Sequence, residues 1–279
     1  MNICFIGGGN MARAIIGGLL KRGFTADQLS VVEIDAAYRE RLKSEYGVLV
    51  LAEQDQQTIQ KSDVVVLAVK PQQLRDVAVQ LSPLLSGQIV LSVAAGIQLK
   101  DLMRWVNNQR NVSAYVRAMP NTPAMVGAGM TGLCYSSFPP GHLLRPEQRE
   151  CIEQIVGAVG SFAWMDSEED MDAVTAVSGS GPAYFFYFIE ALEQAGKELG
   201  LPEQTARKLA LETALGAAKL AHESTEDPAT LRARVTSKNG TTERALLSME
   251  TDHVKQHIIT AVKAAAVRSR EMGEELGKA

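Results

Sequence analysis

The residues of this chain best suited to chemistry begin with a glycine-rich segment near its start. Gly7, Gly9 and Ala12 have the spacing G-x-G-x-x-A. Residues 2–6 before them read as a short apolar strand, and residues 14–20 after them read as an apolar helix. Gly7 can take the backbone angles of a tight turn, and Gly9 has no side chain to keep a pyrophosphate away from the backbone. Ala12 lets the helix lie close to the strand, and N–H groups at the helix N-terminus can bind phosphates. The spacing therefore predicts a dinucleotide site, and the alternative is an ordinary glycine-rich turn.

Three later segments carry candidates for the same site, because each follows a predicted strand. They are Ala68-Val69-Lys70-Pro71, Ala94-Ala95-Gly96 and Met119-Pro120-Asn121-Thr122-Pro123. In a sheet of parallel strands, ligands bind beyond the carboxyl ends of the strands. We therefore expect all three segments to face one crevice.

A fourth segment, residues 235–242, is remote in sequence and leads into a predicted helix. Its hydroxyl groups and Gly240 can leave several N–H groups directed at one spot, which suits a carboxylate or a phosphate. Plain capping of the helix by Thr241 or Thr242 explains the same residues. Spacing alone favours the capping interpretation.

The elements that must position these residues alternate through the first half of the chain. With helices between them, strands are expected at residues 29–32, 48–51, 64–68, 89–93 and 112–116. Residues 64–68 are almost wholly apolar, which is typical of a strand buried on both faces. Two further strands are expected at 130–135 and 162–165, on either side of a helix at 146–159. The alternation predicts parallel pairing in a doubly wound α/β sheet.

The pattern changes after Trp164, where only helices are expected. Their ranges are 172–200, 204–222, 241–249 and 254–276. We therefore predict a dinucleotide-binding α/β domain at 1–164 and an all-α domain at 165–279.

Residues 183–189 are apolar on every side of their predicted helix, so this helix must be buried all round. A small helical domain has too little core to bury it alone. We infer that the domain buries this helix against a second copy of the chain. The alternative is a helix wedged between the two domains of one chain.

The composition argues against several classes of partner and site. The chain of 279 residues is 46% hydrophobic and 22% charged, with a net charge of −4 and no basic stripe. We therefore expect neither nucleic acid nor a membrane as a partner. The three cysteines lie far apart and no basic leader is visible, so we predict free thiols in a reducing cytoplasm. His253 and His257 lack a third ligand, and no metal site is predicted.

Taken together, these motifs resemble the pyrroline-5-carboxylate reductase family over nearly the whole chain and in the same order. Two further motifs are specific to that family: Ser178-Gly-Ser-Gly-Pro182 and Val235-x-Ser237-x-x-Gly240-x-Thr242. The resemblance implies an N-terminal Rossmann domain and a helical C-terminal domain that interlocks with a partner into a homodimer, often assembled further into rings. It implies an oxidoreductase of the last step of proline biosynthesis, which reduces the imine 1-pyrroline-5-carboxylate to L-proline with NADH or NADPH.

The resemblance also assigns roles to individual residues. It puts the substrate carboxylate on the backbone N–H groups of Gly240, Thr241 and Thr242, with Ser237 nearby. It makes the Thr242 hydroxyl the catalytic partner of the imine nitrogen. It puts the coenzyme against the segments at the strand ends, namely Ile6, Gly7, Gly8, Gly9, Asn10, Met11, Glu33, Ala68, Val69, Lys70, Pro71, Ala94, Ala95, Gly96 and Asn121.

The coenzyme preference is expected to depend on Glu33. This residue ends the second predicted strand about twenty positions after Ala12, where a carboxylate accepts from the ribose hydroxyls of NAD. Many members of the family have a small polar residue and an arginine there, which suit the 2′-phosphate of NADPH. A like-charge contact at about 4 Å costs about 4 kcal/mol at an effective dielectric near 20, and less where water screens it. Arg39 and Arg41 offset part of this cost, whereas Asp55 adds negative charge near the adenosine, so we predict NADH over NADPH.

Two rival readings stay open at this point. A two-domain 3-hydroxy-acid dehydrogenase would carry a lysine general acid in the interdomain helix, where this chain has Tyr-Phe-Phe-Tyr-Phe and no lysine before Lys197. A dinucleotide-sensing or lipid-cofactor-binding protein without activity is suggested only by Lys238 and Asn239, which replace Pro and Gly of the usual Ser-Pro-Gly-Gly. Asn tolerates left-handed backbone angles, so we expect the turn to survive.

Overall fold

The computed structural model describes residues 1–107, 111–136 and 143–278 of the chain. By compactness the chain divides into a first unit, Met1–Ser180 with Ala265–Ala279, and a second unit, Gly181–Ala264. This division differs from the boundary expected at 164/165, because the segment up to Ser180 and the end of the last helix pack with the sheet. The functional division into residues 1–164 and 165–279 stays a prediction. Each unit is described below by itself.

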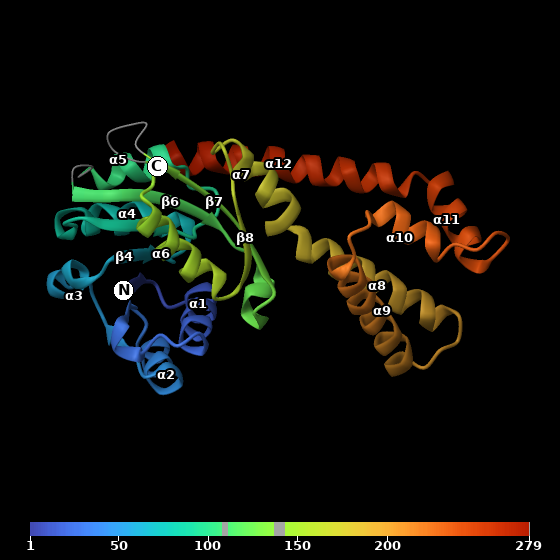
Figure 1. Ribbon diagram of the computed structural model, residues 1–279, viewed down its shortest axis with the longest axis horizontal. Coiled ribbons are helices and arrows are strands. Elements are labelled where there is room, and N and C mark those ends of the chain that lie inside the picture. Colours follow the sequence, from blue (N-terminus) through green and yellow to red (C-terminus); the bar gives the residue numbers. More distant parts are fainter. Residues whose placement is uncertain (108–110, 137–142, 279) are drawn as a thin grey trace. The chain divides into compact units, whose positions relative to one another are not determined.

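The first unit is built on one sheet of eight strands in the order β3-β2-β1-β4-β5-β6-β7-β8 (Figure 1). The strands are β1 Ile3–Ile6, β2 Leu29–Val32, β3 Leu49–Leu51, β4 Val64–Leu67, β5 Gln88–Ser92, β6 Val112–Met119, β7 Gly129–Ser136 and β8 Gly160–Trp164. All four residues of β4 are fully buried, which confirms the expectation of a strand covered on both faces.

Neighbouring strands are parallel except for β6 and β7, which pair antiparallel with Val116 opposite Tyr135. This antiparallel pair departs from the parallel pairing that the alternation of strands and helices predicts. A parallel pair needs a crossover of a dozen or more residues. The link 120–128 holds only the 3-10 helix η4 Thr122–Val126, so the chain can only turn back. β6 also runs to Met119, beyond the expected end at residue 116.

Helices cover both faces of this sheet. One face packs against α1 Asn10–Lys21, α2 Ala36–Tyr46 and α6 Pro146–Gly157. The other packs against α3 Gln56–Lys61, α4 Pro71–Leu81, α5 Leu99–Val106, α7 Asp170–Val174 and the end of α12 Val254–Lys278. Strand residues alternate between the faces, so that Phe5 lies in the first core and Cys4 in the second. The doubly wound α/β fold is therefore confirmed.

The helix expected at 172–200 is interrupted. α7 ends at Val174, a π-helical turn spans Thr175–Gly179, and α8 runs from Gly181 to Glu198. The N–H of Ser180 donates to the carbonyl of Thr175 at 2.8 Å, five residues back. Pro182 has no N–H, so the regular helical ladder cannot continue through this point. Such π-turns occur often at functional sites.

The second unit is all helical. Besides α8 and the start of α12, it contains α9 Glu203–Glu223, α10 Pro228–Arg234 and α11 Thr241–Thr251. The sequence analysis missed α10, although Asp227 accepts from the N–H groups of Ala229 and Thr230 at 2.9 and 3.1 Å and Pro228 stands at its first position. In the single chain Phe185 and Tyr187 of α8 are 69% and 76% exposed.

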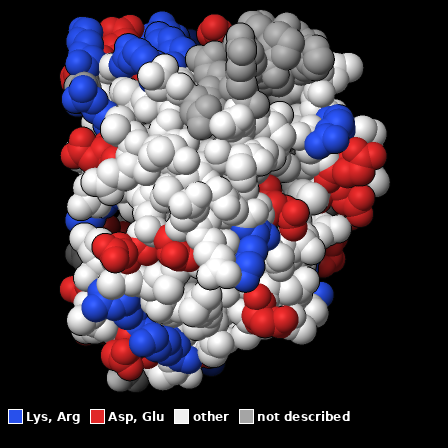
Figure 2. Space-filling model, turned by 90° about the vertical axis from the view of Figure 1, so that its left-hand side faces the viewer, with Lys and Arg blue, Asp and Glu red and all other residues white. Residues whose placement is uncertain are grey.

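The surface carries charges of both signs. On the face shown in Figure 2, basic and acidic residues are interspersed around a largely uncharged centre and form no stripe of one sign. Within the described residues, no helix combines the length and the apolar character needed to cross a membrane.

Two cysteines are buried in the core between the sheet and α3, α4 and α5. Cys4 on β1 and Cys134 on β7 are 0% and 3% exposed. Burial penalises the thiolate and raises the pKa of Cys4 to about 11 and that of Cys134 to about 12. Both thiols therefore stay protonated in the folded chain well above neutral pH.

These thiols should make stability fall in alkaline solution. The unfolded chain releases their protons above about pH 8.5 while the folded chain keeps them, so each thiol costs about 1.4 kcal/mol of unfolding free energy per pH unit. Between pH 8 and pH 10, urea unfolding under reducing conditions should show roughly 3–4 kcal/mol more loss for the natural chain than for Cys4→Ala/Cys134→Ala. Equal losses in the two proteins would contradict the burial of these thiols. Cys151→Ala, at a half-buried thiol, serves as the matched control.

Candidate functional site

A crevice of about 780 Å³ lies at the edge of the sheet where β1, β2 and β4 end. It is lined by residues from the turns after these strands and from the helices that follow. Among the residues expected at the coenzyme, it brings together Ile6, Gly7, Gly9, Asn10, Glu33, Ala68, Val69 and Lys70. The other residues expected at the coenzyme, Gly8, Met11, Pro71, Ala94, Ala95, Gly96 and Asn121, are not among its lining residues.

The turn between β1 and α1 needs its glycines for two different reasons. Gly7 has φ +100°, and a Cβ there would lie 2.7 Å from the carbonyl oxygen of Ala68. Gly9 has φ −69°, and a Cβ there would meet nothing within 4 Å. Gly9 caps α1 without a side-chain hydrogen bond, so the N–H groups of the first turn stay available to a ligand. Packing within the chain therefore does not require a glycine at position 9.

Glu33 is held rigidly in the wall of the crevice. Its carboxylate accepts from the N–H of Gly8 at 2.8 Å and from the N–H of Asp35 at 2.9 Å. Arg39 donates to the carbonyls of Glu33 and Ile34 at 2.9 and 2.7 Å. Two backbone N–H groups thus fix the position of the negative charge, and Gly8 contributes to the site through Glu33.

Two other groups considered for the coenzyme preference are engaged elsewhere. Arg41 forms an ion pair with Glu45 at 2.8 Å. Asp55 caps α3 by accepting from the hydroxyl and the N–H of Thr58, both at 2.8 Å, and these bonds lower the pKa of its carboxyl group. The spacing Asp-x-x-Thr before a helix could have identified this cap from the sequence.

The segment after β5 lies on the same edge of the sheet, because β5 is the parallel neighbour of β4. Gly96 has φ +78°, and a Cβ there would lie 3.3 Å from Leu276 of α12. A Cβ on Gly273 of α12 would in turn lie 3.1 Å from the carbonyl oxygen of Gly96. One side of residues 94–98 is therefore covered by the last turns of α12.

The side chain of Asn121 joins three segments of the first unit. Its amide donates to the carbonyl of Ser178 at 3.1 Å and accepts from the N–H of Met130 at 2.9 Å. In a regular helix Ser178 would accept from residue 182, but Pro182 has no N–H to donate. Asn121 replaces that donor, so the motif Ser178–Pro182 and the end of β6 are linked by one side chain.

The remote bend, residues 235–242, leads directly into α11 in the second unit. Asn239 has φ +60°, which confirms that asparagine can support the left-handed turn expected here. The N–H of Gly240 donates to the carbonyl of Ser237 at 3.0 Å, and the N–H of Asn239 donates to Glu243 at 2.6 Å. No side chain caps α11, so the capping interpretation by a threonine is wrong. The N–H groups of Thr241 and Thr242 remain as donors at the bend.

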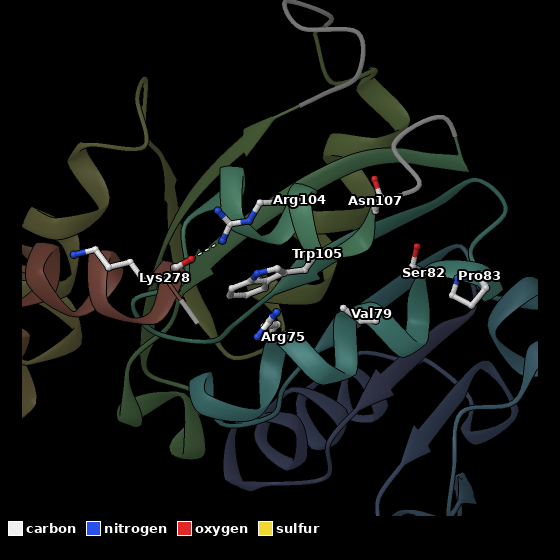
Figure 3. A pocket seen from close by; sticks show the side chains of 9 residues that line it. Arg75, Val79, Ser82, Pro83, Arg104, Trp105, Asn107 and Lys278 are labelled. Carbon is white, nitrogen blue, oxygen red and sulfur yellow. Dashed lines mark hydrogen bonds between the residues drawn. The ribbon is translucent and has the colours of Figure 1, made fainter.

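A second hollow, of about 770 Å³, lies beside α4, α5 and the end of α12 (Figure 3). Arg75, Arg104 and Lys278 line it. Arg104 donates to the carbonyl of Gly277 and pairs with Asp101 at 3.1 Å. All three helices end at this hollow, and Arg104 and Lys278 lie in the last turns of α5 and α12, where cations offset the macrodipole. The helix ends account for these two charges but not for Arg75, which lies in the first half of α4, and we assign no ligand to the hollow.

Two family models match different halves of the chain. A family model described as pyrroline-5-carboxylate reductase dimerisation matches residues 168–272. A model described as NADP oxidoreductase, coenzyme F420-dependent, matches residues 2–96. A pyrroline-5-carboxylate reductase of Pseudomonas aeruginosa is 43% identical over 277 residues, which are 99% of this chain and 98% of that protein. One of Glycine max is 39% identical and covers 96% of this chain and 94% of its own.

Solved structures agree with these matches. A pyrroline-5-carboxylate reductase of Coxiella burnetii superposes with a TM-score of 0.88 at 39% identity and covers 97% of this chain and 98% of that chain. A pyrroline carboxylate reductase of Plasmodium falciparum, solved with NADP bound, gives 0.83 at 27% identity with 98% of each chain covered. The resemblance seen in the motifs is therefore confirmed.

The free energy of unfolding should distinguish the role of Gly7 from that of Gly9. Gly7→Ala combines a positive φ with a collision against Ala68 and should lower the unfolding free energy by about 2–3 kcal/mol. Gly9→Ala has an ordinary φ and open space, so it should stay within about 1 kcal/mol of the natural chain. Urea unfolding of both variants measures this difference, and equal destabilisation would contradict the geometry of the turn.

Proposed function

This chain belongs to the pyrroline-5-carboxylate reductase family, and on this premise we propose that it reduces 1-pyrroline-5-carboxylate to L-proline with a reduced nicotinamide coenzyme. One observation carries the proposal: a single chain combines a crevice whose volume suits a dinucleotide with the bend, residues 235–242, whose motif is specific to this family. This activity is the last step of proline biosynthesis.

The crevice at the ends of β1, β2 and β4 is proposed to hold the coenzyme. Its volume suits a dinucleotide, Gly9 leaves the backbone open, and the uncapped start of α1 offers N–H donors to a pyrophosphate. When bound, the coenzyme supplies the hydride. The residues proposed to contact it outside the crevice are Gly8, Met11, Pro71, Ala94, Ala95, Gly96 and Asn121.

The bend is proposed to bind the carboxylate of the imine. The N–H groups of Thr241 and Thr242 are the donors that the turn leaves free, and the positive end of α11 favours a negative ligand there. The N–H of Gly240 is already used by Ser237, so Gly240 contributes through its small size: a Cβ there would collide with the Ser237 hydroxyl. Lys238 is exposed beside the bend.

Thr242 is proposed as the catalytic residue. Reduction of a neutral imine would leave a nitrogen anion, so the nitrogen must gain a proton before or during the reaction. A hydroxyl is a poor acid at neutral pH. Thr242 therefore orients the imine nitrogen and relays a proton that the substrate carries or that water supplies. Holding the reacting atoms close and aligned then contributes most of the rate.

The helical unit is proposed to form a homodimer, and dimers are proposed to assemble further into rings. Within the single chain, large apolar side chains of α8, α9 and α12 are exposed, including Phe185, Phe186, Leu215 and Ile258. An apolar surface of this extent is typical of an interface between subunits. The buried reduced thiols agree with a cytoplasmic location.

NADH is proposed as the preferred coenzyme. The carboxylate of Glu33 is fixed by two backbone N–H groups and cannot swing away from a 2′-phosphate. Arg39 and Arg41 are engaged with backbone carbonyls and with Glu45. Because Arg41 is paired with Glu45, it offsets the negative charge of Glu33 less than the sequence alone indicates, whereas Arg39 keeps its positive charge close to Glu33.

Removal of the charge at Glu33 should shift the coenzyme preference. Glu33→Gln should raise the ratio of kcat/KM with NADPH to kcat/KM with NADH by at least about tenfold, which is about 1.4 kcal/mol. The natural chain itself should favour NADH in steady-state assays. Asp35→Asn, at the cap of α2, is the matched control. A tenfold preference of the natural chain for NADPH would refute the proposal.

The role of Thr242 can be tested by the oxidation of the coenzyme with pyrroline-5-carboxylate. Thr242→Ala should lower kcat/KM about a hundredfold, within the range of positioned proton-transfer groups, while the Kd of the coenzyme stays unchanged. Thr242→Ser should recover most of the activity because it restores the hydroxyl. A 3-hydroxy acid as substrate tests the dehydrogenase alternative, and activity with it alone would overturn the assignment.

A further inference from the structure

We propose that Glu168 is a positioning residue that fixes residues 94–99 at the carboxyl edge of the sheet and so determines how tightly the coenzyme binds. The inference rests on the proposed function, because that function puts Ala94, Ala95 and Gly96 against the coenzyme. Glu168 itself stands in the link between β8 and α7, far from the coenzyme residues in sequence.

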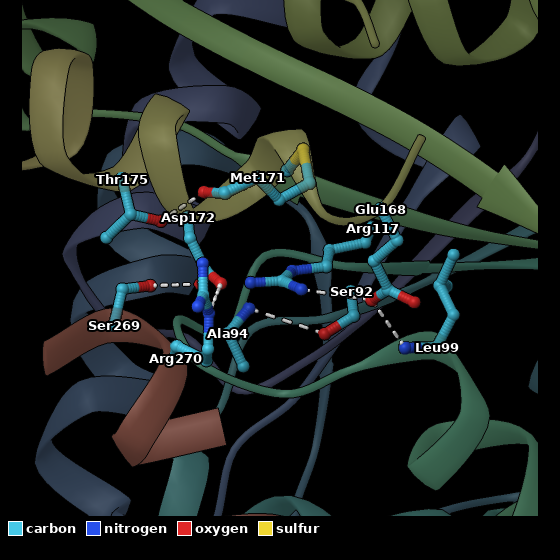
Figure 4. Close-up of polar contacts among 10 residues, drawn as sticks. All are labelled: Ser92, Ala94, Leu99, Arg117, Glu168, Met171, Asp172, Thr175, Ser269 and Arg270. Carbon is cyan, nitrogen blue, oxygen red and sulfur yellow. Dashed lines mark hydrogen bonds and ion pairs between the residues drawn. The ribbon is translucent and has the colours of Figure 1, made fainter. Parts of the chain in front are cut away.

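The first partner of Glu168 is a buried cation. Arg117 lies on β6, and its side chain is only 4% exposed. Its Nη1 donates to Oε1 of Glu168 at 3.0 Å (Figure 4). A guanidinium taken out of water needs a charged partner, and an unpaired one would be strongly destabilising. The burial of Arg117 therefore fixes the position of the Glu168 carboxylate.

The second partner is the start of α5. The same Oε1 accepts from the N–H of Leu99 at 2.7 Å. Leu99 is the first residue of α5, and Gln98 before it provides no side-chain cap. Glu168 therefore caps this helix from 69 residues away in the chain. One carboxylate oxygen joins β6 to the loop that connects β5 with α5.

The segment that carries Glu168 is anchored on its other side. Asp172 of α7 accepts from the hydroxyl of Ser269 at 2.7 Å and lies 3.7 Å from Arg270 (Figure 4). Ser269 belongs to the part of α12 that packs with the first unit, and Leu276 in the same part covers Gly96. Residues 94–99 are thus held by α12 on one side and by Glu168 at their end.

Neutralisation of Glu168 tests the role of the charge. Glu168→Gln keeps the shape and an acceptor oxygen but loses the ion pair with Arg117 and the charge that strengthens the bond from the N–H of Leu99, so the loop should become less well ordered. We expect the Kd of NADH and of NADPH, titrated without imine, to rise about fivefold to tenfold, the effect of exchanging charge-assisted for neutral hydrogen bonds. The KM of the coenzyme should rise in parallel, while kcat at saturating coenzyme changes less than about twofold.

The neighbouring carboxylate offers a matched control. Glu169 is exposed, and Glu169→Gln makes the same change of charge one residue away. This control should bind the coenzyme like the natural chain. Arg117→Gln should raise the Kd of the coenzyme as Glu168→Gln does. Glu168→Asp keeps the charge and should bind the coenzyme more tightly than Glu168→Gln. It also serves as the test variant if Glu168→Gln folds poorly.

The outcomes separate this inference from the proposed function. If Glu168→Gln lowers the melting temperature but binds coenzyme within twofold of Glu169→Gln, Glu168 is merely structural and the inference is overturned. If the natural chain binds the coenzyme but does not reduce pyrroline-5-carboxylate, the proposed function fails, and a weaker Kd in Glu168→Gln still supports the inference.

Discussion

The close approach of two backbones, at Gly7 and at Ala68, is the constraint on which the site depends. β1 and β4 are adjacent in the middle of the sheet, and the chain must turn from β1 into α1 without striking the end of β4. With 2.7 Å between the Cβ position of Gly7 and the carbonyl oxygen of Ala68, only glycine fits. The floor of the crevice is therefore made of main chain, and its shape changes little with the surrounding side chains.

Polar side chains at this edge of the sheet mainly satisfy backbone groups of other segments. Glu33 accepts from Gly8, Asn121 donates to Ser178, and Glu168 accepts from Leu99. Each bond joins parts of the chain that are far apart in sequence. Because strand ends and helix starts leave backbone groups without regular partners, such links give loops the order that a pre-formed site requires.

Local patterns were sufficient to predict the frame of the fold. Three features can be read from residues that are adjacent in sequence: the apolar run of β4, the glycine spacing before α1 and the Asp-Pro pair at the start of α10. The sequence analysis overlooked the Asp-Pro pair. The antiparallel β7 could have been inferred from the short link after Met119, because no crossover fits there. The break after α7 was also visible, since Pro182 removes an N–H from the helical ladder.

The long-range links could not be predicted in this way. Nothing near Leu99 indicates that its cap comes from Glu168, because the contact depends on the register of β6 and on the path between β8 and α7. The carboxylate of Glu33 was expected from its position, but its bond to Gly8 depends on how two turns pack. The residues of the bend, 235–242, suggested an anion site, but only the family resemblance favoured that role, since their spacing alone favoured a simple cap.

The division of α12 between the units has a consequence for how the protein is made. The first unit consists of two stretches of chain, and the whole helical unit is inserted between them. Gly273 and Leu276 are translated after the helical unit, yet they cover the loop after β5. During synthesis the dinucleotide-binding half therefore cannot finish folding first, although most of it leaves the ribosome first. A fragment that ends at residue 180 would lack the end of α12 and would expose the surface of α5 that α12 covers. Cleavage of the chain at one position therefore cannot separate the two units.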